Sequence, residues 1–145
     1  MLRKILFPTD FSEHSVNAKK QIKKLAGCSK ELILLHVLDN RFFPYLDGID
    51  GIEIENLNLM GVLSKQANKN LEKWKAEFEK AGFKKVRVAL IEGNPFHVIL
   101  EFADAKKVSS IFLGHQGTGA VERMLLGSTA EKVSRKANVP VVLVK

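Results

Sequence analysis

The chain has 145 residues, of which 46% are hydrophobic and 27% charged, a composition typical of one globular domain spanning residues 1–145. It contains no apolar stretch near the roughly 20 residues that a membrane-spanning helix needs, and its single cysteine, Cys28, excludes an intrachain disulfide. The formal net charge of +7 would suit a polyanionic partner, but the lysines and arginines fall in short pairs along the chain, which is typical of solvated helix faces.

The first third of the chain has the pattern strand, helix, strand. An apolar run over residues 4–7 stops at Pro8, and apolar residues then recur at helical spacing up to Gly27, which we expect to close the helix. These apolar residues are Val16, Ile22, Leu25 and Ala26. Residues 31–37 form a continuous apolar run, typical of a strand that is covered on both faces. This pattern indicates a parallel sheet.

The middle of the chain begins with a long irregular connection and ends in a clear helix. Residues 38–61 show no period and are too many for a routine loop, so we expect a flap there. Its aromatic residues would either cover a pocket or pack against the domain: Phe42, Phe43 and Tyr45. One apolar stripe at spacings of four and three then predicts an amphipathic helix that ends at Gly82. The stripe consists of Leu63, Ala67, Leu71, Trp74, Phe78 and Ala81.

The last part of the chain continues the alternation. We predict strands over residues 85–91 and 110–113 and a helix over 95–104 between them, followed by a helix over 128–137 and a last strand from Val139 to Val144. Five strands then alternate with four helices. The fold class is therefore α/β: an open five-stranded parallel sheet with helices on both faces, a Rossmann-like nucleotide-binding fold. Ligands of such sheets bind at the carboxyl ends of the strands, where the strand order reverses.

A glycine-rich segment follows the fourth predicted strand. Gly114, Gly117 and Gly119 lie close to the strand end, and Gly127 and Ser128 open the last helix. Glycines let backbone N–H groups approach an anion, and a helix start adds unpaired N–H donors, so phosphate is the natural ligand. The alternative is purely structural. In it the glycines form turns, and Ser128 with Glu131, three residues on, forms a capping box.

Other motifs are missing or weak. The dinucleotide fingerprint and the P-loop are both absent, and the histidines lack metal-ligand spacing: His14, His36, His97 and His115. Asp47, Asp50 and Glu53 do not fit a calcium loop. Cys28 has no identifiable base partner, and no catalytic pair is evident. We therefore predict no metal site and no catalytic residues.

The spacing of the glycine segment matches a known pattern. Gly114-x2-Gly117-x9-Gly127-Ser128 has the full G-x2-G-x9-G-[ST] spacing of the universal stress protein family, which the chain resembles over essentially its whole length. Further matching segments are Ile5-Leu6-Phe7-Pro8-Thr9-Asp10-Phe11-Ser12, His36-Val37, Glu92-Gly93-x-Pro95 and Pro140-Val141-Val142-Leu143-Val144. The resemblance implies an ATP-binding site, with Mg²⁺ as a companion of the phosphates.

The resemblance also implies roles for individual residues. Asp10 would face the adenine, Pro8 and Thr9 would line its pocket, and the backbone of Val37 would contact the base. Contacts to the ribose and the phosphates would come from Gly114, His115, Gln116, Gly117, Gly127, Ser128 and Thr129. Without the family, an Asx turn or helix cap is the simpler interpretation of Asp10, with Ser12 as a rival cap.

One position departs from the family pattern. Some ATP-binding relatives carry a hydroxyl two residues after the serine, where this chain has Ala130. Unless Thr129 compensates, a phosphate contact is lost and ATP would bind more weakly. Similar proteins also carry a Glu at position 131, so that residue does not by itself argue against a bound anion.

These observations predict a nucleotide-binding regulator in which ATP biases the pocket loops and a partner surface, while any hydrolysis is slow. The alternatives are an ATP-independent dimeric interaction protein, a true ATPase or nucleotidyl transferase and, last, an RNA-binding protein. Because an unpaired sheet edge invites another chain, we expect a homodimer through the strand from Val139 to Val144. The short apolar run after Met1 does not form an export signal, which predicts a cytoplasmic location.

Overall fold

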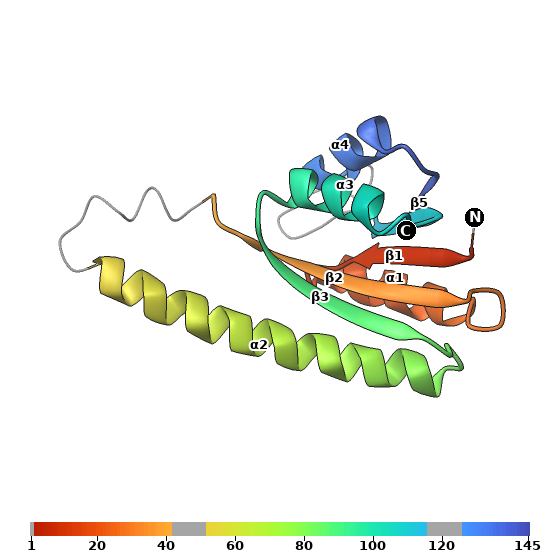
Figure 1. Cartoon of the computed structure of the whole chain (residues 1–145), viewed down its shortest axis with the longest axis horizontal. Coiled ribbons are helices and arrows are strands. Elements are labelled where there is room, and N and C mark those ends of the chain that lie inside the picture. The colour runs from red at the N-terminus through yellow and green to blue at the C-terminus, as the bar shows by residue number, and fades with distance from the viewer. Residues whose placement is uncertain (1, 42–51, 116–125) are drawn as a thin grey trace.

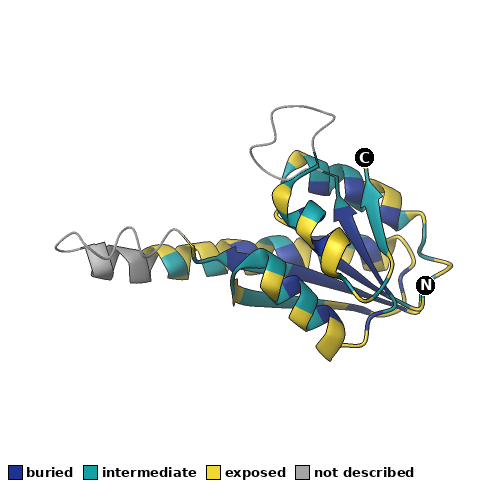
Figure 2. Ribbon diagram, turned by 90° about the horizontal axis from the view of Figure 1, so that it is seen from above, coloured by how far each residue is buried: buried dark blue, intermediate teal, exposed yellow. Residues whose placement is uncertain are grey.

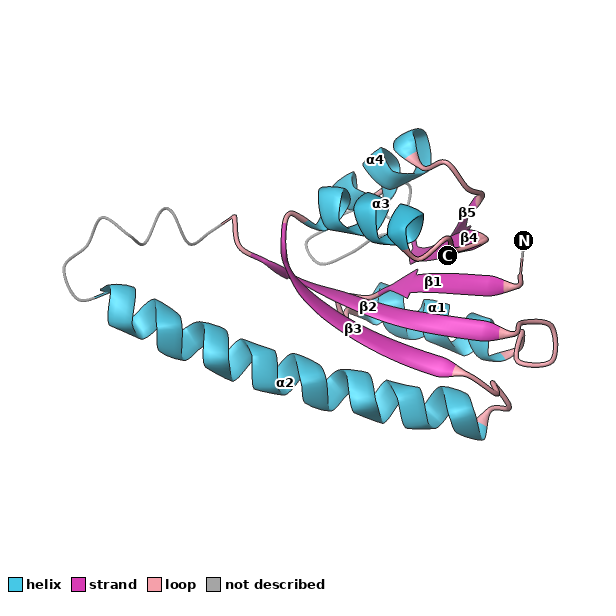
Figure 3. Ribbon diagram, in the orientation of Figure 1, coloured by secondary structure: helices cyan, strands magenta, loops and turns pink. Residues whose placement is uncertain are grey.

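The computed structural model describes residues 2–41, 52–115 and 126–145, and for residues 52–58 only the backbone. Strands and helices alternate along the chain, as Figures 1 and 3 show. Their bounds are β1 (Lys4–Pro8), α1 (Glu13–Lys23), β2 (Glu31–Asp39), α2 (Ile52–Lys80), β3 (Val86–Gly93), α3 (Pro95–Ala105), β4 (Ser110–Gly114), α4 (Ser128–Lys136) and β5 (Val141–Val144). Among the described residues, no helix is long and apolar enough to cross a membrane.

The strands described here form one sheet in the order β3-β2-β1-β4-β5, and every neighbouring pair is parallel. The predicted open parallel sheet is confirmed. The chain builds the sheet outward from β1 through β2 to β3, then crosses back to place β4 and β5 on the other side of β1. The strand order therefore reverses between β1 and β4, and β5 lies at an edge of the sheet, as predicted.

Two helices cover each face of the sheet (Figure 1). Successive side chains of a strand point to opposite faces, so Ile5 and Phe7 join one apolar cluster and Leu6 joins the other. The first cluster includes residues of α1 and α2, and the second includes residues of α3 and α4. Figure 2 shows the buried positions concentrated in the strands and on the helix faces that cover them.

The first helix ends earlier than the sequence predicts. Gly27 does not close it: α1 ends at Lys23, and Lys24 occupies the cap position in right-handed helical conformation. The chain then leaves the helix through a series of tight turns, in which the N–H groups of Lys24 and Leu25 each bond to a carbonyl three residues back. These turns keep negative φ, so none of them needs a glycine.

The second helix begins much earlier than the sequence predicts. The predicted connection over residues 38–61 is too long, because β2 continues to Asp39 and α2 starts at Ile52. In the sequence, the alternation of Ile and Glu at 52–55 suggests no helical stripe, and Gly61 is a weak helix former. The later, strongly amphipathic part of α2 nevertheless stabilises the helix, which continues back through Gly61 to Ile52. The expected flap and its aromatic residues Phe42, Phe43 and Tyr45 lie outside the described residues.

The last strand is shorter than predicted. It spans Val141–Val144 rather than starting at Val139, because Pro140 has no N–H to donate to the ladder. The Pro140 carbonyl still accepts a hydrogen bond from the Ile111 N–H at 3.0 Å, so pairing with β4 starts at this residue.

Candidate functional site

The reversal of strand order puts the candidate site at the carboxyl ends of β1 and β4. These strands are neighbours and parallel, so their ends at Pro8 and Gly114 lie at the same edge of the sheet (Figure 1). The segments that leave the two strands diverge there, toward α1 on one face and α4 on the other. Every described site residue predicted from the sequence lies on a segment that reaches this edge.

Hydrogen bonds of Thr9 hold the segment after β1 in place. Its N–H donates to the Leu35 carbonyl at 2.8 Å, and its hydroxyl oxygen accepts from the Phe11 N–H at 3.0 Å. The Thr9 carbonyl lies 2.7 Å from Nδ1 of His36, and because a carbonyl can only accept, that nitrogen carries the proton. Thr9 is buried, so it acts first as the anchor of this segment.

Asp10 prepares the start of α1. Its Oδ1 accepts hydrogen bonds from the Ser12 N–H and from the buried Ser15 hydroxyl, both at 2.9 Å. Ser12 is the N-cap of α1, and its hydroxyl accepts from the Ser15 N–H. The Asx-turn interpretation of Asp10 is therefore confirmed, with Ser12 as the helix cap. The adenine contact of Asp10 stays a prediction.

Phe11 adopts a conformation that is unusual for a side chain with a Cβ. Its φ is 60°, in the left-handed region, which costs about 1–2 kcal/mol for an L-residue. The Phe11 ring lies between two others, with centroid distances of 4.9 Å to His36 and 5.0 Å to Trp74 of α2. These contacts offset the strain and fix the direction in which the chain turns away from the sheet edge.

Gly114 lies where α1 packs on the end of β4. A Cβ at this position would be 3.2 Å from both the carbonyl carbon and the carbonyl oxygen of His14, and 3.4 Å from the Ser15 nitrogen. Because the neighbouring backbone would have to shift by a few tenths of an ångström to admit a Cβ, this close approach favours a residue without a side chain. This packing role explains the glycine independently of any bound phosphate.

A short chain of hydrogen bonds joins β4 to the start of α4. The His115 N–H donates to the Val144 carbonyl at 2.8 Å, and the Gly127 N–H donates to the His115 carbonyl at 3.2 Å. The two halves of the glycine pattern, Gly114 and Gly127-Ser128, are therefore close together in space although they are 13 residues apart in sequence. Gln116 and Gly117 lie outside the described residues.

The structural alternative for this segment, a capping box of Ser128 and Glu131, does not form at the start of α4. Gly127, not Ser128, occupies the N-cap position, and the Glu131 carboxylate pairs with Arg135 instead of folding back on the helix end. This register shift makes Ser128 the first helical residue, where a hydroxyl no longer caps. The first backbone N–H groups of α4 are those of Ser128 and Thr129. Within the described residues, no side chain accepts a hydrogen bond from them. Glu131 therefore does not compete with an anion there.

Three further residues named in the sequence analysis lie near this edge: Ala130, Val37 and Pro8. Ala130 is 5% exposed and packs into the apolar cluster with α3, so its side chain faces the sheet. The β1–β2 pairing ends at Pro8 and Leu35, and Val37 lies two residues further along β2, past the end of β1. Pro8 is buried, and Val37 is half-buried.

The charged groups near the end of β2 are paired with each other. Arg41 donates to both carboxylate oxygens of Asp39, and this hydrogen bonding lowers the pKa of Asp39. Arg41 is thereby engaged rather than held ready for a phosphate. In the parts of the chain that the structure describes, no three His, Cys, Asp or Glu side chains are grouped closely enough to hold a metal ion.

Sequence reasoning missed the supporting residues Phe11, Ser15 and His36. The bond between His36 and Thr9 joins residues 27 positions apart, so no local pattern signals it. Ser15 looks like an ordinary polar residue of an amphipathic helix. The only available signal was the run Thr9-Asp10-Phe11-Ser12, whose side chains can form turns and caps with their own backbone.

The fold and this edge define a doubly wound α/β protein whose strand order reverses between β1 and β4. A family model described as the universal stress protein family matches residues 1–145, and this chain belongs to that family. It is 38% identical to the universal stress protein MJ0577 of Methanocaldococcus jannaschii, over 100% of this chain and 96% of that protein. It is 33% identical to the universal stress protein YxiE of Bacillus subtilis, over the full length of both.

Solved structures agree with the sequence comparison. The MJ0577 structure superposes with a TM-score of 0.89 at 36% identity, covering 100% of this chain and 96% of that one. The universal stress protein UspA of Lactobacillus plantarum superposes with a TM-score of 0.87, covering 99% and 98% of the two chains. At 20% identity, this second likeness concerns the fold alone.

Proposed function

We propose that this chain is an ATP-binding regulatory protein of the universal stress protein type. Bound ATP would bias the loops at the carboxyl edge of the sheet and, through them, a surface that partners recognise. The observation that carries the proposal is the hydrogen bond from the Gly127 N–H to the His115 carbonyl, which brings the described ends of the G-x2-G-x9-G-[ST] pattern together. Turnover of ATP is not required for this role.

The chemistry of the edge supports phosphate as the ligand. The N-terminus of α4 offers backbone N–H groups and a partial positive charge, and the hydroxyls of Ser128 and Thr129 lie in its first turn. The pairing of Glu131 with Arg135 leaves this helix end without a competing carboxylate cap. Ser128 and Thr129 would hold the outer phosphates, and Mg²⁺ would neutralise part of their charge.

The position of Ala130 answers the objection that the missing hydroxyl at this residue weakens phosphate binding. Its side chain packs against the sheet, so it does not share the helix face that presents the Ser128 hydroxyl. The missing hydroxyl at position 130 therefore leaves the proposed contacts of Ser128 and Thr129 in place. At the base end of the nucleotide, the Asp10 carboxylate would accept from the exocyclic amine of adenine and so favour ATP over GTP.

The test is the melting temperature of nucleotide-free protein with and without millimolar Mg-ATP, with Mg-GTP in parallel. A ligand at 100 times its dissociation constant stabilises the folded state by about 2.7 kcal/mol, which raises Tm by about 5–10 °C for a chain of this size. We expect this shift for ATP and a much smaller one for GTP.

Variants test whether the ATP-induced rise in Tm arises at the start of α4. The double variant Ser128→Ala/Thr129→Ala should lose most of the ATP-induced shift, because each lost hydrogen bond to a charged phosphate costs about 1.5–3 kcal/mol. The control is Ser134→Ala, which removes an exposed hydroxyl from the same helix; this hydroxyl donates to the Glu131 carbonyl of its own helix. If neither nucleotide shifts Tm, the ATP-independent interaction protein replaces this proposal.

We further propose that the protein works in the cytoplasm as a homodimer that pairs through β5. Pro140 and Val144 direct their carbonyls toward β4, and bonding alternates along a parallel strand. The backbone groups of Val141 and Leu143 therefore point away from β4, toward the open edge of the sheet. An apolar edge strand of this kind favours pairing with a second copy.

A further inference from the structure

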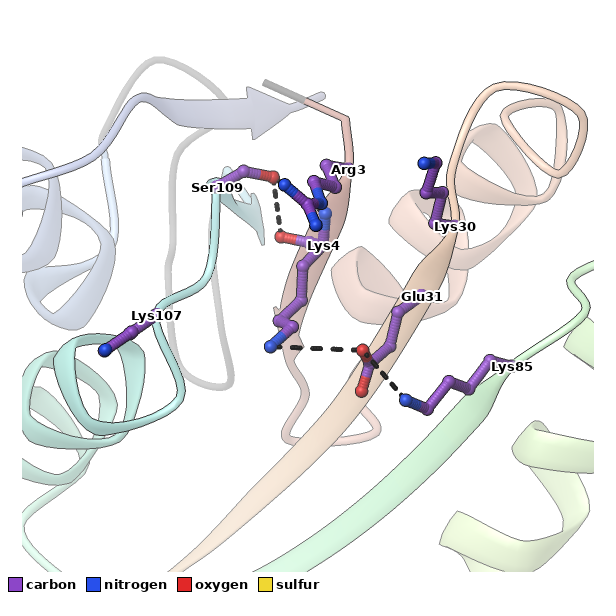
Figure 4. Close-up of a pocket in the computed structure, with 7 residues that line it drawn as sticks. All are labelled: Arg3, Lys4, Lys30, Glu31, Lys85, Lys107 and Ser109. Carbon is purple, nitrogen blue, oxygen red and sulfur yellow. Dashed lines mark hydrogen bonds and ion pairs between the residues drawn. The ribbon is translucent and has the colours of Figure 1, made fainter.

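A second candidate site lies at the other end of the sheet. The segments that lead into β1, β2, β3 and β4 surround a hollow of about 460 Å³ (Figure 4). These segments lie at the amino ends of the strands, whereas the proposed nucleotide site lies at their carboxyl ends. The size is that of a pocket for a small ligand.

The lining of the hollow is strongly basic. It consists of Arg3, Lys4, Lys30, Glu31, Lys85, Lys107 and Ser109, which is five cations against one carboxylate. No lining residue is aromatic and none is a large aliphatic residue. A concave surface with charge of one sign concentrates the electrostatic field, so this hollow attracts anions.

The single carboxylate is already shared among several cations. The Glu31 side chain is only 10% exposed and lies 4.0 Å from Lys4 Nζ, 3.4 Å from Lys85 Nζ and 3.2 Å from Arg87 Nε. Figure 4 shows Lys4 of β1 and Lys85, the residue before β3, reaching toward it from either side. Glu31 therefore serves to hold the base of the hollow together and cannot neutralise the rest of its charge.

Three cations remain at the rim. Across residues 2–41, 52–115 and 126–145, no ion pair joins Arg3, Lys30 or Lys107 to a carboxylate. All three are exposed, and Figure 4 shows Lys30 and Lys107 on opposite sides of the hollow, directed away from Glu31. Their charges are available to a ligand.

The backbone that carries these cations is well anchored. The Arg3 carbonyl accepts from the N–H groups of Lys30 and Glu31, at 3.2 and 3.1 Å. The Ser109 N–H and hydroxyl both donate to the Lys4 carbonyl, at 2.9 Å each. The backbone that carries the rim lysines is therefore fixed, which reduces the conformational entropy that ligand binding must overcome.

Helix termini explain only part of this charge. Cations are favourable in the last turn of a helix, and the helices of this fold end at the amino edge of the sheet. Arg3 and Lys30, however, belong to no helix, and Lys107 follows the cap of α3 with a φ of 51°. Their presence around one hollow is not required by the helices.

We propose that this hollow binds a compact multivalent phosphate anion, an oligophosphate chain without bases. Lysines act as point charges that suit phosphate oxygens, and Arg3 adds a planar donor group. The absence of an aromatic side chain from the lining argues against nucleic acid, whose bases stack on aromatic rings. The site is independent of the ATP site and is tested separately.

The experiment measures binding of linear inorganic tripolyphosphate to the full chain by calorimetry at low salt. The double variant Lys30→Glu/Lys107→Glu should weaken binding by about tenfold or more, since charge-assisted bonds to two phosphates are replaced by repulsion. The control Lys65→Glu/Lys69→Glu changes the net charge equally at two exposed lysines of α2 that do not line the hollow. It should weaken binding by less than about threefold.

Four results would overturn the proposal. The first is that tripolyphosphate does not bind the unaltered protein. The second is an equal loss of affinity in both double variants, which would show a general charge effect. The third is full affinity of the variant at Lys30 and Lys107, which would put the anion at another site such as the carboxyl edge. A single-stranded oligonucleotide with the same number of phosphates is the last comparison: tighter binding than tripolyphosphate would make the hollow a nucleic-acid site instead.

Discussion

Replacing Gly114 by alanine tests the closest backbone approach at the candidate site. The added methyl group would lie 3.2 Å from the His14 carbonyl, a contact that only a backbone shift can relieve. We expect the free energy of unfolding to fall by about 1–3 kcal/mol, as in other overpacked sites. Urea denaturation measures this change.

The matched control is Gly27→Ala. A Cβ at Gly27 meets no atom within 4 Å, and its φ is not positive. This change should leave stability the same or raise it by up to about 1 kcal/mol, because alanine restricts the unfolded chain. Equal losses for the two variants would show that Gly114 has no special packing role.

At the scale of elements, an ion-pair cluster joins α1 to α2. Glu77 Oε2 of α2 lies 2.7 Å from Lys19 Nζ and 2.9 Å from Lys23 Nζ of α1. Lys19 also lies 4.4 Å from the centre of the Trp74 ring. Burial raises the pKa of Glu77, but the hydrogen bonds and charges of the two lysines outweigh it, so the pKa lies below its ordinary value of 4.5.

This shift predicts a stability change in acid. Because the folded-state pKa is lowered, the contribution of Glu77 is fully present above the unfolded pKa of 4.5 and is lost as the pH falls through the folded-state pKa. Glu77→Gln should therefore be less stable than the unaltered protein at pH 7, and the difference should shrink below pH 4.5. Urea denaturation at a series of pH values measures it.

The control for this prediction is Glu79→Gln on the same helix. The Glu79 carboxylate lies 3.8 Å from Lys75, four residues earlier, and no ion pair among the described residues joins it to α1. Its difference from the unaltered protein should change little over the same pH range. A constant difference for Glu77→Gln as well would mean that the contact with α1 does not carry the effect.

At the scale of the whole molecule, the proposed dimer depends on the outward backbone of β5. Leu143→Pro removes an N–H that points to the open edge and leaves the alternate bonds between β4 and β5 in place. We expect the unaltered protein to sediment as a dimer at micromolar concentration and this variant as a monomer. Circular dichroism checks that the variant remains folded. A monomeric unaltered protein would contradict the proposed pairing.

The charge distribution also emerges only at this scale. In the sequence, the lysine and arginine pairs are scattered, which favours the interpretation as solvated faces. In the fold, each helix of the alternating pattern returns to the amino edge before the next strand begins. Segments that lead into different strands therefore meet there, and Arg3, Lys30 and Lys107 surround one hollow although they are far apart in sequence.

Local patterns in the sequence determined the fold class and the family. Hydrophobic period and apolar runs depend on near neighbours, so they predict the alternation of strands and helices, and the glycine spacing identifies the family. Helix ends were predicted less well: α1 stops at Lys23 and α2 starts at Ile52, because helix ends depend on which backbone groups find partners.

Only the tertiary structure decided which distant residues meet. The strand order and its reversal between β1 and β4 come from contacts between strands, which the local hydrophobic period does not specify. The same holds for the bond from His36 to Thr9 and for the hollow at the amino edge. The physical reason is that these arrangements depend on how apolar faces pack and bury backbone hydrogen bonds across the whole sheet, which no short stretch of sequence encodes.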